Sequence, residues 1–123
     1  MDMQNGLFAD AIAQVLTRFA SDFEVYLSDS PDQTEELCVD GMANLVLMEA
    51  VPFGSRSLEA RLRLRDRLRR LRPACRIVLV VDEKTDPKLA ENVRTAKKDG
   101  LIDQFIYSSI SSEYLSALID TLC

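Results

Sequence analysis

Three short apolar runs, separated by helical patterns, constrain the fold of this chain more than any other feature. They occupy residues 44–48 (NLVLM), 76–81 (RIVLVV) and 104–107 (QFIY). A weaker run, residues 23–27 (FEVYL), alternates apolar and polar side chains as a strand does. Strands that alternate with helices indicate a parallel sheet with helices on both faces, because each parallel strand is reached through a crossover. We therefore predict one α/β domain over residues 1–123, with four strands in a three-layer α/β/α sandwich.

The segments between and around these runs carry helix signals. Apolar side chains recur at helical spacing, serine or aspartate precedes several of the helical patterns, and a proline or glycine ends two of them. These signals predict helices over residues 7–19, 30–38, 57–72, 86–100 and 111–122.

Composition excludes several classes of function. No apolar run approaches the ~18 residues of a membrane span, and the first six residues (MDMQNG) do not resemble a secretory signal. The chain has no histidine, and its three cysteines (Cys38, Cys75 and Cys123) are widely spaced. We therefore predict a cytoplasmic protein with reduced thiols, no membrane contact, no metal site and no catalysis that needs imidazole.

The charge is unevenly distributed. Nine arginines against two acidic residues give residues 56–76 a formal charge of +7, so the rest of a chain of net charge −5 carries −12. On a helical wheel a core-facing row is bordered by two arginine rows. The core-facing row is Ala60, Leu64, Leu68 and Leu71; the arginine rows are Arg61, Arg65, Arg69 and Arg72, and Arg63, Arg67 and Arg70.

Two interpretations of the arginine helix remain open. It is an ordinary amphipathic helix with arginines that extend to solvent, or it is a docking surface for an acidic protein, including a second copy of this chain. Nucleic-acid binding is disfavoured because the overall charge is negative and no aromatic side chains are interspersed.

Four segments of the chain resemble the response-regulator receiver family. They are residues 7–16 (LFADAIAQVL), 44–52 (NLVLMEAVP), 76–83 (RIVLVVDE) and 100–119 (GLIDQFIYSSISSEYLSALI). The resemblance implies a flavodoxin-like fold with strand order 2-1-3-4-5 and a role in two-component signalling. Receivers accept a phosphoryl group on an aspartate, with help from Mg²⁺ held by two acidic residues, a threonine or serine, and a lysine.

The positions that carry this chemistry are replaced here. Alignment on the family's pattern places Met48 at the phosphoacceptor, four residues before Pro52, and places Met3 and Gln4 at the acidic pair. The family's lysine-proline pair falls on Ser108 and Ser109, and its threonine on Val81 or Asp82. The resemblance therefore implies a degenerate receiver that has no catalytic residues, metal or cofactor and is not an enzyme.

Two alternatives remain. Glu49 or Asp82 retains Mg²⁺-dependent phosphorylation, although Glu49 and Met48 should face opposite sides of a regular strand. Alternatively, the chain is the regulatory domain of a transcription regulator, with DNA bound only by a domain outside this sequence.

The first strand of the family has no counterpart in the sequence. Only six residues precede the first helical pattern, and they are not apolar enough for a central strand. Either residues 23–27 pair directly with residues 44–48, or another chain supplies a strand, or the natural protein begins further upstream.

The expected function is therefore protein contact, either homodimerisation or docking on another protein. By resemblance the contact face is the helix–strand–helix surface formed by Lys88–Lys98, Gln104–Tyr107 and Ser112–Leu122, with Tyr107 contributing to it. The arginines at 61, 65, 69 and 72 form the second candidate surface.

Overall fold

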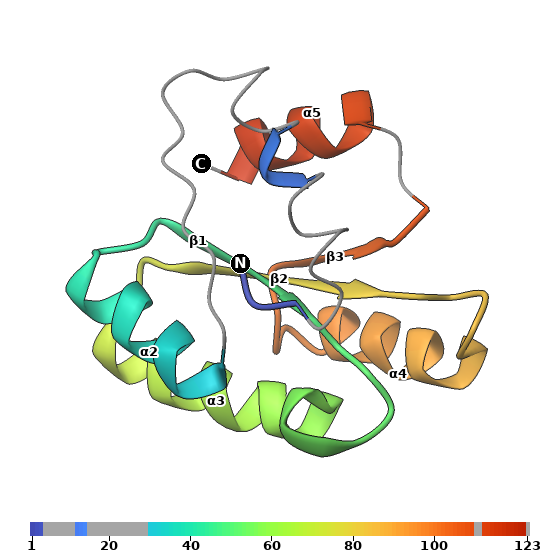
Figure 1. Ribbon diagram of the computed structural model, residues 1–123, viewed down its shortest axis with the longest axis horizontal. Helices are drawn as coiled ribbons and strands as arrows, with labels where there is room; N and C mark the ends of the chain where they lie inside the picture. The colour runs from blue at the N-terminus through green and yellow to red at the C-terminus, as the bar shows by residue number, and fades with distance from the viewer. Residues whose placement is uncertain (4–11, 15–29, 110–111, 123) are drawn as a thin grey trace.

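The computed structural model describes residues 1–3, 12–14, 30–109 and 112–122, and within them three parallel strands form one sheet. The strands are β1 (Leu45–Glu49), β2 (Arg76–Val81) and β3 (Gln104–Tyr107), in the order β1-β2-β3 (Figure 1). These are the three strong strands predicted from the sequence, with β1 starting and ending one residue later. The predicted strand at residues 23–27 lies outside the described residues.

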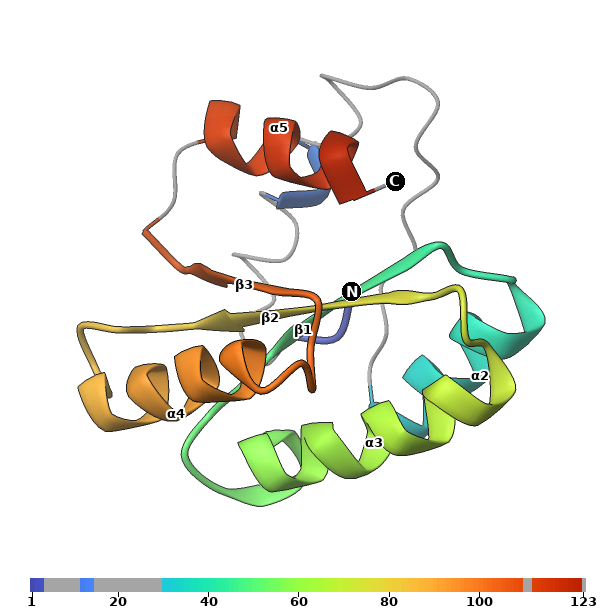
Figure 2. The ribbon, with the colours of Figure 1, turned by 180° about the vertical axis from the view of Figure 1, so that it is seen from behind.

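Helices cover both faces of the sheet, so the predicted three-layer α/β/α arrangement is confirmed. One face carries α2 (Pro31–Asp40), α3 (Leu58–Leu71) and α4 (Pro87–Lys98), and the other carries α5 (Ser112–Leu122) (Figures 1 and 2). A short 3-10 helix, η1 (Gly54–Arg56), precedes α3. Of the helix predicted at residues 7–19, only 12–14 are described, and these are helical. No helix in the described parts is long and apolar enough to span a bilayer.

Local capping explains where these helices begin. The side chains of Ser30, Ser57 and Asp86 each accept a hydrogen bond from the backbone N–H three residues later, at 3.2, 3.2 and 2.9 Å. These bonds satisfy N–H groups that have no partner inside the helix. Gly100 follows α4 with φ of +78°, a conformation that glycine adopts without strain. The predicted starts of these helices are therefore confirmed.

Both faces of the central strand are buried, which explains its continuous apolar sequence. Ile77, Leu79 and Val81 pack in a cluster with residues of α2, α3 and α4. Val78 and Val80 point to the opposite face and pack with residues of α5. The alternation is the period of two expected for a strand between two helical layers.

No strand precedes β1 in the described residues, but the outer edge of β1 is not open. Asp2 forms a parallel bridge with Met48. The Asp2 N–H donates to the Leu47 carbonyl at 2.9 Å, and the Glu49 N–H donates to the Asp2 carbonyl at 2.9 Å. Residues 1–3 therefore take the place of the first strand beside the end of β1.

Helix α3 departs from the predicted wheel at both of its ends. Leu64 and Leu68 are buried as predicted, but so is Arg61, whereas Leu71 is 56% exposed. Leu71 is the last residue of the helix, where the core no longer covers it. The predicted core position of Leu71 is therefore wrong.

This difference gives a matched pair of substitutions. Leu68→Ala removes a fully buried side chain and should lower the free energy of unfolding by about 3 kcal/mol. Leu71→Ala, the same change one turn later, should lower it by less than about 1 kcal/mol, because its side chain is already in solvent. Urea unfolding followed by circular dichroism measures both, and equal losses would show that the end of α3 packs differently.

Candidate functional site

The residues that end the three strands lie together at one edge of the sheet. Glu49 pairs with Val80, and Val81 pairs with Tyr107, so the carboxyl ends of β1, β2 and β3 are in register. Ligands of open parallel sheets bind at this edge. The predicted site residues Met48 near the end of β1, Asp82 after β2 and Ser108 after β3 lie at this edge. The predicted site residue Gln4 lies outside the described residues.

The residue at the predicted phosphoacceptor position is part of the hydrophobic core. Met48 is completely buried and packs in the cluster under α2, α3 and α4. Met3 is also buried, but in the cluster on the α5 side. Two positions assigned to the pocket by resemblance are therefore parts of the hydrophobic core.

A buried ion-pair cluster lies next to Met48. The Asp2 carboxylate has no exposed surface, and its Oδ2 accepts from Arg61 Nη1 at 2.7 Å and from Thr34 Oγ1 at 2.8 Å. Its Oδ1 accepts from Arg56 Nε at 2.8 Å. Three elements, α2, η1 and α3, thus each supply one donor to a single carboxylate.

All three guanidinium nitrogens of Arg61 donate hydrogen bonds inside the protein. Its Nη2 donates to the Asp2 carbonyl at 3.0 Å, and its Nε donates to the Glu49 carbonyl at 2.9 Å. The side chain is only 1% exposed. The prediction that Arg61 belongs to an interaction surface is therefore wrong: the arginine row that begins at Arg61 starts inside the core.

The ion pairs of Asp2 lower the pKa of its carboxyl. Burial by itself raises the pKa of the Asp2 carboxyl, but the hydrogen bonds and charge of Arg61, with the bonds from Arg56 and Thr34, outweigh it. The pKa of Asp2 is held below its usual value of 3.8. The carboxylate is therefore charged throughout the physiological pH range.

The sequence did not predict that Asp2, Thr34 and Arg56 would come together in one cluster. One signal was present: in Met1-Asp2-Met3 the side chains alternate, and the structure places Met1 and Met3 together in the α5-side cluster while Asp2 contacts α2 and α3. A three-residue alternation is too short to distinguish a strand from a chain terminus.

Glu49 sits next to Met48 but not in the same environment. Met48 packs with the cluster under α2, α3 and α4, whereas Leu47 packs with the α5-side cluster. Regular alternation puts Glu49 on the side of Leu47, as predicted from the sequence. Its side chain is only partly buried.

Asp82, after β2, folds back onto its own loop. Its carboxylate accepts from the backbone N–H groups of Lys84 and Thr85 at 3.1 and 3.2 Å, and from the Thr85 hydroxyl at 2.7 Å. The Thr85 hydroxyl, followed by these N–H groups, lowers the pKa of Asp82. The side chain is exposed and stabilises a turn.

The serines that follow β3 are also engaged locally. The Ser108 N–H donates to the Val81 carbonyl at 3.0 Å, and the Ser109 hydroxyl donates to Glu83 Oε1 at 2.6 Å. Within the described residues, no group of three or more histidine, cysteine or acidic side chains is arranged to hold a metal ion.

The other arginines of the predicted docking surface have partners within the chain. Arg65 Nε donates to the Leu101 carbonyl at 2.7 Å, Arg69 Nη2 pairs with Asp103 at 3.0 Å, and Arg72 Nη2 donates to the Met42 carbonyl at 3.1 Å. All three arginine side chains are partly buried. Much of the positive charge predicted for an external partner is thus used to hold α3 against neighbouring loops.

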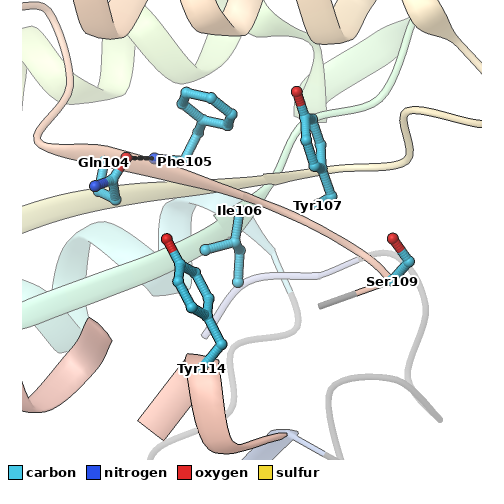
Figure 3. Close-up of a pocket in the computed structure, with 6 residues that line it drawn as sticks. All are labelled: Gln104, Phe105, Ile106, Tyr107, Ser109 and Tyr114. Carbon is cyan, nitrogen blue, oxygen red and sulfur yellow. Dashed lines mark hydrogen bonds between the residues drawn. The ribbon is translucent and has the colours of Figure 1, made fainter. Parts of the chain in front are cut away.

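A shallow groove of about 320 Å³ runs along the exposed edge of β3 towards α5 (Figure 3). It is lined by Gln104, Phe105, Ile106, Tyr107, Ser109 and Tyr114. Tyr107 is held on the α4 side: its hydroxyl accepts from Arg94 Nη1 at 2.7 Å, and its ring meets Phe105 edge to face with centroids 5.6 Å apart. Tyr114 projects from α5 on the other side of the strand.

Comparison with solved structures decides the fold. A LuxR-family DNA-binding response regulator from Staphylococcus aureus superposes with a TM-score of 0.72 at 16% identity, covering 98% of this chain and 93% of the other. A response regulator protein from Burkholderia multivorans gives 0.68 at 19% identity, with 98% and 90% covered.

The signal receiver domain of NarL from Mycobacterium tuberculosis gives a TM-score of 0.66 at 16% identity, with 94% and 87% covered. The chain has the receiver-domain fold. No protein-family model matches the sequence, and no curated protein is similar to it in sequence. The receiver-like arrangement predicted from four sequence segments is therefore confirmed at the level of fold.

The buried ion pair should dominate the effect of charge on stability. Asp2→Asn leaves the buried Arg61 guanidinium without its counter-charge and should lower the free energy of unfolding by about 3 kcal/mol at pH 7. Asp66→Asn, which removes the exposed partner of Arg65, is the control and should change it by less than about 1 kcal/mol.

The pH dependence of the free energy of unfolding tests the same ion pair. Because the native pKa of Asp2 is lowered, the stabilisation is complete above the ordinary pKa of 3.8 and is lost as the pH falls through the native pKa. The stability difference between the natural protein and Asp2→Asn should stay constant from pH 7 to about pH 4 and narrow below it. A difference that does not narrow in acid would contradict the assigned ion pair.

Proposed function

We propose that this chain is a degenerate receiver-like signalling domain of the cytoplasm that works through protein contact without aspartyl phosphorylation. It is not an enzyme in this proposal and needs no cofactor. Its partner is a second copy of the chain or another signalling protein.

The observation that carries the proposal is the complete burial of Met48 at the phosphoacceptor position. A thioether in a packed core supplies neither a nucleophilic oxygen nor a route for a phosphodonor. Phosphoryl transfer also requires positive charge arranged around the transferred group. Arg61 donates to the carbonyl of Glu49, the residue after Met48, and each of its three guanidinium nitrogens is bonded to Asp2 or Glu49.

The face formed by α4, β3 and α5 supports a role in contact. β3 is an edge strand of the described sheet, and an unpaired strand edge favours association with another chain. Tyr114 is 59% exposed beside the groove on this edge. Tyrosine is enriched at the energetic centres of protein interfaces.

Phosphorylation is tested directly by intact mass spectrometry after incubation with Mg²⁺ and acetyl phosphate. We expect an unchanged mass. Met48→Asp should also remain unmodified, because the acidic pair and the lysine of receivers are absent. A stable increment of one phosphoryl group on the natural protein would contradict the proposal and favour Glu49 or Asp82 as an acceptor.

The contact face is tested by light scattering over a range of protein concentrations. If the groove mediates self-association, Tyr114→Glu should raise the concentration at which dimers form by about tenfold or more. Phe53→Glu is the matched control, since Phe53 is 86% exposed in the loop after β1, outside the groove. Equal effects of the two substitutions, or an unaffected dimer, would contradict this choice of face.

A regulatory domain of a transcription regulator is the second candidate. It is favoured by the likeness to a structure described as a DNA-binding response regulator. DNA would then be bound by a domain outside this chain, so the chain alone should not retard a DNA fragment in a gel. Retardation by the chain alone would contradict both this candidate and the leading proposal.

A further inference from the structure

Two rows of opposite charge lie side by side on the outer surface of α2 and α3. The acidic row consists of Asp32, Glu36 and Asp40 of α2, and the basic row consists of Arg63, Arg67 and Arg70 of α3. All three acids are exposed, as are Arg63 and Arg70, and the Arg67 side chain is 42% exposed. In the part of the chain that the structure describes, the side chains of Arg63 and Arg70 make no ion pair or hydrogen bond.

Contacts between the two helices fix how the rows lie relative to each other. Arg67 Nε donates to Glu35 Oε1 at 2.7 Å, and Arg72 Nη2 donates to the Met42 carbonyl at 3.1 Å. These bonds join residues 32 and 30 positions apart, so α2 and α3 run side by side in the same direction (Figures 1 and 2). Corresponding members of the two rows are 31, 31 and 30 positions apart. Each acid therefore lies at the same level along the helix pair as one arginine.

Two further acids of α3 do not cancel the basic row. A helix turns by about 100° per residue, and Arg67 marks the side of α3 that faces α2. Glu59 and Asp66 are exposed on the other side of the basic row, away from α2. Asp66 is also bonded to Arg65 at 2.8 Å. The strip of α3 next to α2 is therefore basic, and it lies beside the acidic strip of α2.

Exposed apolar side chains lie at one end of both rows. Leu71, the last residue of α3, is 56% exposed, and Met42, in the turn after α2, is 65% exposed. Met42 has a φ of +52°, a left-handed conformation that glycine and asparagine adopt more readily. A methionine there contributes little to the core of its own chain, whereas it adds apolar surface that another protein can cover.

We propose that the outer surface of α2 and α3 binds the same surface of a second copy of this chain. A two-fold axis parallel to the helices and between them places α2 of one copy over α3 of the other, with both helices in the same direction. Because acids and arginines lie at matching levels, each acidic row meets a basic row, and Met42 meets Leu71 of the second copy. A partner of a single charge would instead face one repelling row.

This interface does not depend on the proposed function. The groove at β3 lies towards α5, which covers the opposite face of the sheet from α2 and α3 (Figures 1 and 2). A dimer through α2 and α3 therefore leaves that groove open to another signalling protein. Exposed ion pairs are individually weak and are screened by salt, so the dimer should be strongest at low ionic strength.

Analytical ultracentrifugation at low salt, up to millimolar protein, tests the interface. The natural chain and Tyr114→Glu are both measured, because Tyr114→Glu removes association through the groove. In either background, Arg63→Asp with Arg70→Asp should raise the dimer dissociation constant about tenfold or more, because both rows then carry negative charge. Adding Asp32→Arg with Asp40→Arg to the same chain exchanges the charges of the rows and should restore the dimer.

The matched control changes the net charge equally at another place. Lys84→Asp with Lys88→Asp replaces two exposed cations in the loop after β2 and the first turn of α4, and it should leave the dimer unchanged. A natural chain that stays monomeric at every concentration would overturn the proposal. An equal loss in the control, or no recovery when the rows are exchanged, would overturn it as well.

Met42→Asn tests the apolar end without changing the charge. Asparagine adopts a positive φ more readily than methionine, so the melting temperature should not fall. The dimer should nevertheless weaken several-fold, because Leu71 of the second copy loses its apolar partner. A dimer that Met42→Asn leaves unchanged would contradict the arrangement in which Met42 meets Leu71.

Discussion

The buried ion pair between Asp2 and Arg61 is the interaction on which the rest of this arrangement depends. Two charges removed from water cost more than their attraction returns unless every donor and acceptor is satisfied. Here the carboxylate accepts from three side chains, and the guanidinium donates to the Asp2 side chain, the Asp2 carbonyl and the Glu49 carbonyl. The pair thereby fixes residues 1–3 beside β1 and draws α2 and α3 towards one point.

Under the proposed function, this arrangement explains how the receiver-domain fold can be kept without phosphoryl chemistry. The carboxyl edge of a parallel sheet is where ligands bind, because loops diverge there and leave space. In this chain that space is taken by side chains: Met48 fills the core, Arg61 spans from α3 to the sheet, and Asp82 closes its own turn. The outer surface formed by α4, β3 and α5 does not involve these side chains, so the proposed protein contact through it does not require phosphorylation.

Local patterns predicted the parts of the structure that local physics determines. The three apolar strands, the helix starts at Ser30, Ser57 and Asp86, and the opposite environments of adjacent β1 residues all follow from side-chain alternation and capping within a few residues. The resemblance also assigned positions to the pocket through Pro52 and the strand ends, and these assignments stay predictions.

The sequence could not reveal contacts between distant segments. Asp2 and Arg61 are 59 positions apart, and a helical wheel treats Arg61 as one member of a charged row, although it lies three and seven residues from the buried Leu64 and Leu68. Only the presence of Asp2 makes burial of that arginine favourable.

In the proposed function, the carboxyl edge of this sheet does not bind a phosphoryl group or its metal. The most direct measurement is a ¹⁵N–¹H NMR titration of the chain with Mg²⁺ and then with beryllofluoride, which mimics a phosphoryl group on a carboxylate. We expect no saturable shifts among the amides of Glu49, Asp82 and Ser108. Saturable shifts that cluster on those three residues would show a working pocket and contradict the proposed function.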